Sequence, residues 1–210
     1  MKNLIKLNLV LLLSVILSVS TVFAGSKVAR DGENFIKAGT KMVYAVVNGD
    51  KKYDFIVTIK QLSPELVFDW EMTSPINTKG TITIPQKDMQ HAMAFYNYFS
   101  PGSLTLDGET SVWLSNDQFN QVKNNRYGIF KLDGKNGKET PMKVVKNTPN
   151  MPIPVITPNV NGKPMTLNTI YLNNGILGDN MKEVVLLDSK DFPIIVKMNL
   201  GWTITLKEIK

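Results

Sequence analysis

Apolar and polar residues alternate along most of the chain with a period of two. In residues 53–59 the side chains of Tyr53, Phe55, Val57 and Ile59 share one face, because successive side chains of a β-strand point to opposite sides. Another alternating run precedes this one, and Asn48–Gly49 lies between the two. An Asn-Gly pair between such runs is a strong signal for a tight turn. The sequence therefore predicts a β-hairpin around Asn48–Gly49.

The alternation continues to the end of the chain. Leu66, Phe68, Trp70 and Met72 are expected to face inward from the next strand. Further strands are predicted within residues 80–85, 103–115, 126–134, 140–146, 165–175, 182–189, 192–199 and 201–209. The pattern indicates an all-β, mainly antiparallel fold. We expect a single curved half-barrel or open barrel of about ten strands, with one or two short helices on its concave side.

Two segments depart from simple alternation. Residues 184–187 are apolar on both faces, which predicts a strand that is covered on both sides. Residues 149–164 hold five of the eleven prolines. Because proline cannot donate a ladder hydrogen bond, this stretch is expected to be a connector or an extended flap.

Met89–Phe99, "MQHAMAFYNYF", has the spacing of an amphipathic helix, with Phe95, Tyr96 and Phe99 on its apolar side. We expect this helix to fill part of the concave face, with Phe95 and Tyr96 mostly buried. A second short helix is predicted in residues 115–124, where Ser115 and Gln118 have capping-box spacing.

Residues 1–24 have the features of a cleavable signal peptide. Lys2 and Lys6 precede an apolar run of mainly leucine and valine that is interrupted by serines. Small or apolar residues then lead up to Ala24. We expect cleavage before Gly25, a single domain over residues 25–210, and a periplasmic or extracellular location. The apolar run is shorter than the ~20 residues that span a bilayer, so no transmembrane segment is expected.

Composition narrows the chemistry further. The chain has no cysteine, which excludes disulfides and thiolate sites. Its formal net charge is +6, but the lysines are scattered among acidic residues, whereas a nucleic-acid surface needs a basic stripe. Nucleic-acid binding is therefore not expected.

Few residues are candidates for catalysis. His91 is the only histidine and has no second histidine or cysteine with which to hold a metal. It is interpreted as a surface residue. Two carboxylate pairs, Asp69 with Glu71 and Asp107 with Glu109, have a spacing that an acid–base pair could use. The simpler interpretation places the first pair on the wet side of a strand and the second in a turn. No catalytic residue, metal or cofactor is assigned.

Two stretches resemble a known family. Residues 38–59, "AGTKMVYAVVNGDKKYDFIVTI", and residues 188–209, "DSKDFPIIVKMNLGWTITLKEI", resemble the opening and the ending of the periplasmic proteins called domain of unknown function 3108. The resemblance covers the two ends of the chain only. It implies the half-barrel-and-helix architecture of lipoprotein carriers and no catalytic residues.

Three functional hypotheses remain open. The first is non-catalytic binding of a lipid or another apolar or amphiphilic molecule between the helix and the sheet. The second is a scaffold or interaction module with a solid core, for which an envelope protein would be the partner, and the third is a hydrolase that uses surface carboxylates. The methionines favour either core filling or an adaptable pocket. For the first hypothesis we predict a pocket closed by the proline-rich flap and lined by Trp70, Met72, Met93, Tyr96 and Trp202.

Overall fold

The computed structural model describes residues 27–28, 35–149 and 152–210. The predicted signal peptide, residues 1–24, and its cleavage site lie outside the described residues. None of the helices in the described part of the chain has the length and apolar character needed to cross a bilayer.

Strands dominate the described part of the chain, which also holds two α-helices and one 3-10 helix. The helices are α1 (Gln86–His91), α2 (Asn116–Asn125) and the 3-10 helix η1 (Gly178–Asn180). The strands of the first half are β1 (Lys27–Val28), β2 (Lys41–Asn48), β3 (Lys51–Gln61), β4 (Leu66–Met72), β5 (Thr78–Ile84), β6 (Ala94–Phe95), β7 (Gly102–Thr105) and β8 (Glu109–Thr110). Those of the second half are β9 (Tyr127–Lys131), β10 (Glu139–Val144), β11 (Asn159–Val160), β12 (Lys163–Thr166), β13 (Thr169–Asn173), β14 (Glu183–Leu187), β15 (Ile195–Asn199) and β16 (Thr203–Ile209).

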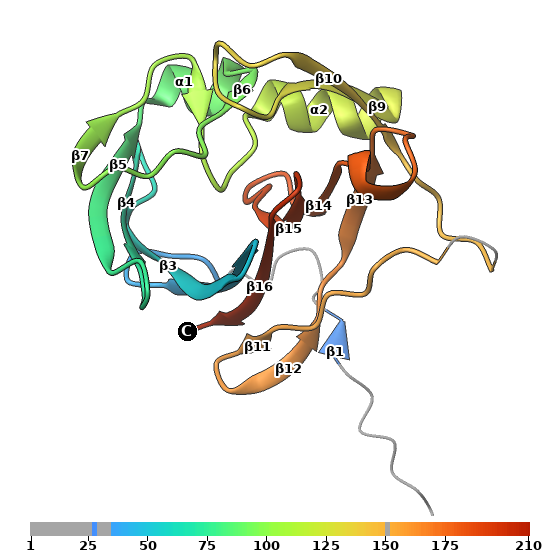
Figure 1. The fold of residues 1–210 in the computed structure, drawn as a ribbon. Coiled ribbons are helices and arrows are strands. Elements are labelled where there is room, and N and C mark those ends of the chain that lie inside the picture. Colours follow the sequence, from blue (N-terminus) through green and yellow to red (C-terminus); the bar gives the residue numbers. More distant parts are fainter. Residues whose placement is uncertain (1–26, 29–34, 150–151) are drawn as a thin grey trace, which may run out of the picture.

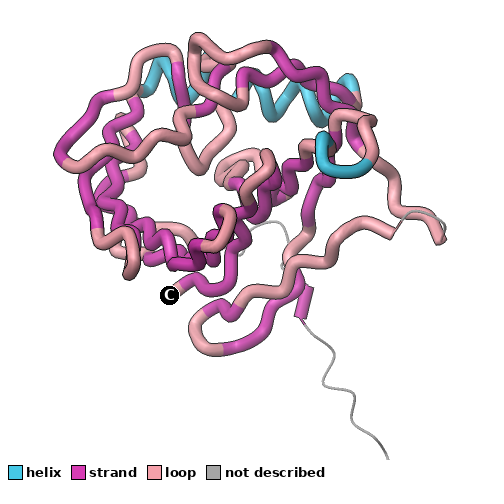
Figure 2. Tube along the Cα trace, viewed as in Figure 1, coloured by secondary structure: helices cyan, strands magenta, loops and turns pink. Residues whose placement is uncertain are grey.

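The strands form one curved, unclosed sheet. Its order is β7-β5-β4-β3-β2-β16-β15-β14-β13-β10-β9-β6-β8, and it curls so that α1, α2, β6, β9 and β10 lie along one side of the ring (Figure 1). Helices α1 and α2 lie on that side, and the 3-10 helix η1 lies beside β13 (Figure 2). Strands β11, β12 and β1 lie outside the ring. The all-β, open half-barrel prediction is confirmed. The strands outnumber the predicted ten because several of them contain only two residues.

The predicted hairpin forms between β2 and β3, one residue out of register with the prediction. Asn48 pairs with Lys51, so the two turn residues are Gly49 and Asp50. Gly49 has a φ of +57°, a conformation that glycine adopts without a steric cost. On the strands beyond the turn, the predicted inward faces are confirmed, with Phe55, Val57 and Ile59 all buried.

The predicted helix over Met89–Phe99 is wrong. Helix α1 is displaced toward the N-terminus, begins after Pro85 and ends at His91, and Ala92 already has extended dihedral angles. The chain then forms β6, which pairs with β8 and β9. The amphipathic pattern was real, but strand pairing overrides helix propensity here. The aromatic residues therefore reach the core from an extended segment.

The second helix is confirmed as α2. Ser115 is its N-cap, and its hydroxyl oxygen accepts a hydrogen bond from the Gln118 amide at 3.2 Å. The Gln118 side chain bonds the carbonyl oxygen of Met93 instead of completing a capping box. Phe119 and Val122 are buried, as predicted.

Two hydrophobic clusters meet at β14, which is buried on both faces as predicted. Val185 and Leu187 belong to the larger cluster, which also holds the inward residues of β2–β5. Val184 and Leu186 belong to the smaller cluster under α2. The proline-rich segment adds Ile156, which is buried, to the larger cluster, while Val155 is 73% exposed. The described part of this segment is thus a connector that lies outside the ring and packs Ile156 against the larger cluster.

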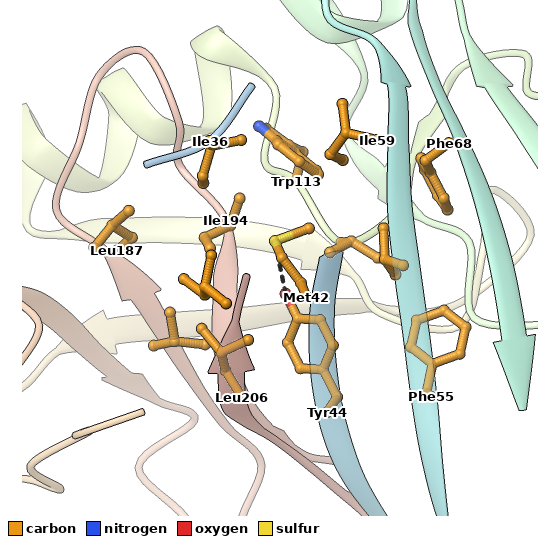
Figure 3. Packing of buried hydrophobic residues seen from close by; sticks show 14 of the residues in the cluster. Ile36, Met42, Tyr44, Phe55, Ile59, Phe68, Trp113, Leu187, Ile194 and Leu206 are labelled. Carbon is orange, nitrogen blue, oxygen red and sulfur yellow. Dashed lines mark hydrogen bonds between the residues drawn. The ribbon is translucent and has the colours of Figure 1, made fainter. Parts of the chain in front are cut away.

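Tyr44 is fully buried in the larger cluster (Figure 3). Its hydroxyl donates a hydrogen bond to the carbonyl oxygen of Ile195 at 3.0 Å and lies 3.8 Å from the Met42 sulfur. Burial raises the pKa of Tyr44 far above its usual range. The neutral hydroxyl is therefore part of the folded state at any ordinary pH.

Tyr44→Phe is expected to cost about 1–2 kcal/mol at neutral pH, because the buried Ile195 carbonyl loses its donor. Because folding raises the pKa of Tyr44, the neutral phenol contributes stability. This contribution is fully present below the unfolded-state tyrosine pKa of about 10 and is lost as the pH rises above that value. The wild type should therefore lose more stability between pH 9 and 11 than Tyr44→Phe. Urea unfolding across that pH range measures the difference, and parallel pH profiles would contradict it.

Candidate functional site

An open cavity of about 210 Å³ lies on the concave side of the sheet. We call it the inner cavity. It is lined by Val46, Asn48, Tyr53, Phe55, Met72, Asn97, Tyr98, Phe99, Asp133, Trp202 and Ile204. Most of these side chains are apolar or aromatic. Of the polar residues, Asn48 ends β2, Asp133 comes from the turn between β9 and β10, and Asn97 comes from the segment that follows β6.

Strand periodicity supplies the floor of the inner cavity. Val46 pairs with Tyr53 and also with Ile204, and Phe55 pairs with Met72. Residues paired across neighbouring strands point to the same face of a sheet. The alternating pattern of β2, β3, β4 and β16 therefore places these side chains together on the concave side.

The segment after β6 covers this floor. The Phe99 ring lies against those of Phe55 and Trp70, with centroids 4.6 and 5.2 Å away, and against that of Tyr96 at 5.8 Å. Hydrogen bonds hold the segment in place: the Tyr96 amide donates to the Thr110 carbonyl at 2.8 Å. Phe99 therefore packs on the aromatic side chains of the concave face and covers part of it.

The anchoring continues at Asn97. Its side-chain amide donates to the carbonyl oxygen of Leu132, in the turn between β9 and β10. The same side chain also lines a second void of about 30 Å³. The void and the inner cavity share four further lining residues, Phe55, Phe99, Trp202 and Ile204. The two spaces therefore lie next to each other at Phe99.

The mouth of the inner cavity is polar and weakly charged. Asp133 lines it, and its carboxylate lies 3.8 Å from the Lys182 ammonium. Burial raises the pKa of Tyr53, which also lines the cavity, so its phenol stays neutral near pH 7. A ligand with an apolar end and a hydrogen-bonding end fits this arrangement.

The five residues predicted to bind a ligand are only partly brought together. Met72 and Trp202 line the inner cavity. Trp70 and Tyr96 do not line the inner cavity, but their rings contact the ring of Phe99, which does. Met93 was expected to face inward, but it is 40% exposed and is not among the lining residues, because the chain is extended there. The described residues of the proline-rich segment, 149 and 152–164, do not line this cavity, so the predicted flap closure is wrong for them.

Most of the lining residues were not assigned to the site from the sequence; of those that line the inner cavity, only Met72 and Trp202 were named. Phe99 was placed on a helix, and Asn97 and Asp133 carried no signal at all. Tyr53 and Phe55 were predicted to face inward but were not assigned to the pocket. Strand pairing between segments distant in sequence creates these juxtapositions, and alternation alone does not reveal them.

A larger, shallow groove of about 670 Å³, which we call the outer groove, crosses the opposite face of the sheet. Asp69 and Glu71 line it. Asp69 lies 3.2 Å from the Lys60 ammonium and accepts a hydrogen bond from Thr81 at 2.8 Å. The Asp69 carboxylate is thus held by neighbouring side chains, on the wet side of the strand as predicted.

The remaining candidates lie elsewhere. His91 is exposed, as predicted, and its Nδ1 lies 2.8 Å from the Asp117 carboxylate, across α1 and α2. It is not among the residues that line the outer groove. Asp107 is exposed and ion-paired with Lys87, and the hydrogen bond from Lys87, together with its positive charge, lowers the pKa of that carboxyl. Within the described ranges, no three histidine, aspartate or glutamate residues are placed to hold a metal ion.

Comparisons with known proteins add no relative. The resemblance of the two chain ends to domain of unknown function 3108 proteins therefore stays a prediction. A scan against protein-family models, a search of curated proteins and a search of solved structures each found no match.

Proposed function

We propose that this protein binds, without catalysis, a small apolar molecule or the short apolar tail of an amphiphile in the inner cavity. The observation that carries the proposal is an aromatic-lined, 210 Å³ opening in the concave core. For comparison, an engineered apolar cavity of about 150 Å³ in another protein binds benzene. The inner cavity therefore has room for one ring or a short alkyl chain, and not for a whole phospholipid.

The lining fits such a ligand. Phe55, Phe99 and Trp202 offer ring faces and edges, and Met72 offers a flexible thioether that can adapt to different shapes. Asn48, Asn97 and Asp133 provide hydrogen-bonding groups for a polar end. The predicted export signal is consistent with a carrier outside the cytoplasm, and the periplasmic or extracellular location stays a prediction.

The scaffold hypothesis favours a solid core, and the inner cavity argues against it. The hydrolase hypothesis requires acid and base groups to converge, whereas Asp69 is held by Lys60 and Thr81 and His91 pairs with Asp117. Ligand binding is therefore the function that the geometry supports best.

A series of straight-chain alcohols tests the proposal by isothermal titration calorimetry. Each methylene that enters the cavity contributes about 0.8 kcal/mol, or roughly a fourfold gain in affinity. We expect the gain to stop once the chain exceeds the length that the cavity accommodates. Adsorption to the surface would instead show no such plateau and no saturation.

A cavity-filling variant locates the binding. Met72→Trp should weaken binding of the best alcohol by roughly tenfold or more, because the larger side chain occupies the ligand's volume. Leu104→Trp is the matched control, since Leu104 is 40% exposed on β7 and does not line the cavity. Equal affinities in the two variants, or no saturable binding by the wild type, would refute the proposal.

A further inference from the structure

Five turns lie at one end of the sheet, and three of them contribute lining residues of the inner cavity, namely Asn48, Asp133 and Trp202. Adjacent strands place four of them at one end of the sheet through the pairs Asn48–Lys51, Met72–Thr78, Asn199–Thr203 and Asn173–Glu183. The ion pair of Lys182 with Asp133 brings the β9–β10 turn to the same end. We call these turns the cavity rim; they are residues 48–52, 73–77, 132–138, 174–182 and 199–202.

Apolar side chains are exposed at this end of the sheet. Within the described residues, seven large apolar side chains are exposed, and four of them lie on the cavity rim or beside it. Leu177 is 88% exposed and Ile176 is 51% exposed, both at the tip of turn 174–182. Tyr98, which is 61% exposed, lines the mouth, and Val47 precedes turn 48–52. Single exposed apolar residues are ordinary, but a group at one end of the sheet suggests an interaction surface.

Turn 174–182 holds its apolar tip outward by hydrogen bonds. The Asn174 carbonyl oxygen Oδ1 accepts from the amides of Ile176 at 3.3 Å and Lys182 at 3.1 Å. The Asn174 side-chain amide donates to the Asn180 carbonyl at 3.1 Å. One side chain thus ties the two arms of the turn together, and the exposure of Ile176 and Leu177 follows from this local framework.

The cavity rim has a net positive charge, which favours a negatively charged partner. The five turns contain five lysines and three aspartates, so the rim is moderately positive. Apolar tips on a surface with an excess of lysines, here in turns 48–52 and 132–138, suit the interface of a membrane that contains anionic lipid. A lipid surface would also be the source of the amphiphile proposed for the cavity.

We propose that the cavity rim docks on an anionic phospholipid bilayer, with Ile176 and Leu177 inserted at the headgroup boundary. This inference rests on the proposed function, because it supplies the surface from which a ligand enters the cavity. Docking would place the mouth against the bilayer, so that an apolar tail moves from lipid to protein without crossing water.

Vesicle flotation with residues 25–210, the chain expected after the predicted cleavage, tests the docking. The vesicles are phosphatidylcholine with about 30% phosphatidylglycerol, and pure phosphatidylcholine is the comparison. The wild type should float with the anionic vesicles and less with the neutral ones. The double variant Ile176→Ser, Leu177→Ser should bind the anionic vesicles roughly tenfold less, because its insertion tip is polar.

Val155→Ser is the matched control, since Val155 is 73% exposed on the proline-rich segment, away from the rim turns. It should bind vesicles like the wild type. The tip variant should still bind the alcohols in solution with unchanged affinity, which separates docking from cavity binding. Absence of wild-type flotation, or equal flotation of the tip variant, would overturn the docking proposal and leave the proposed function in place.

Discussion

Phe95→Ala is expected to lower the free energy of unfolding by about 3–5 kcal/mol, the range for truncating a buried aromatic side chain. Phe95 is 1% exposed in the smaller cluster, where Phe119, Phe130 and Leu132 are also buried. It lies on β6, which joins β8 and β9. Truncation therefore leaves a void where α2 and the strands it covers meet. Urea unfolding at neutral pH measures the loss.

His91→Ala is the matched control from the same stretch of sequence. His91 is exposed, and its pairing with Asp117 is a surface contact, so the change should stay within about 0.5 kcal/mol. Equal losses in the two variants would mean that the extended path of residues 92–99 does not bury Phe95 as described.

Lys197→Met is expected to cost about 3 kcal/mol, because it leaves a buried carboxylate without its cation. Glu183 is 5% exposed, and its two oxygens are bound by different partners. The Lys197 ammonium lies 2.5 Å from Oε1, and the Tyr171 hydroxyl donates to Oε2 at 3.0 Å. The three residues come from the neighbouring strands β15, β14 and β13, so the loss acts at the centre of the sheet.

Two further variants separate this effect from the loss of a surface lysine. Lys210→Met removes an exposed pairing with Glu208 and should change stability by less than about 1 kcal/mol. Adding Glu183→Gln to Lys197→Met should recover much of the loss, since the unpaired charge is then gone. A double variant no more stable than Lys197→Met alone would show that the buried charge is not the cause.

The strands were the most predictable part of the fold. The inward faces of β3 and β4 follow from alternation alone, because one side of the sheet is dry and the other is wet. The two-sided burial of β14 could be predicted from its continuous apolar run. The order of the strands could not, because it depends on pairings such as β2 with β16 between the two ends of the chain.

Residues 89–99 show where local pattern fails. Their apolar spacing fits a helix, and α1 does occupy part of it, but β6 gains partners on both sides in β8 and β9. The sequence contains no local sign of those partners. The same change of path carries Met93 to the surface and brings Phe99 onto Phe55 and Trp70. The candidate site was therefore predicted in outline, as a space between the sheet and an aromatic segment, with two of its five predicted residues lining the cavity.

The measurement that tests the ligand-binding account most directly is an isotope-filtered nuclear Overhauser spectrum of the labelled protein with the best-binding alcohol. We predict contacts from the alkyl protons to Val46, Phe99, Trp202 and Ile204, all of which line the inner cavity. Contacts confined to outer-groove residues such as Lys79 and Thr81 would contradict the account, as would a complete absence of contacts at saturating alcohol.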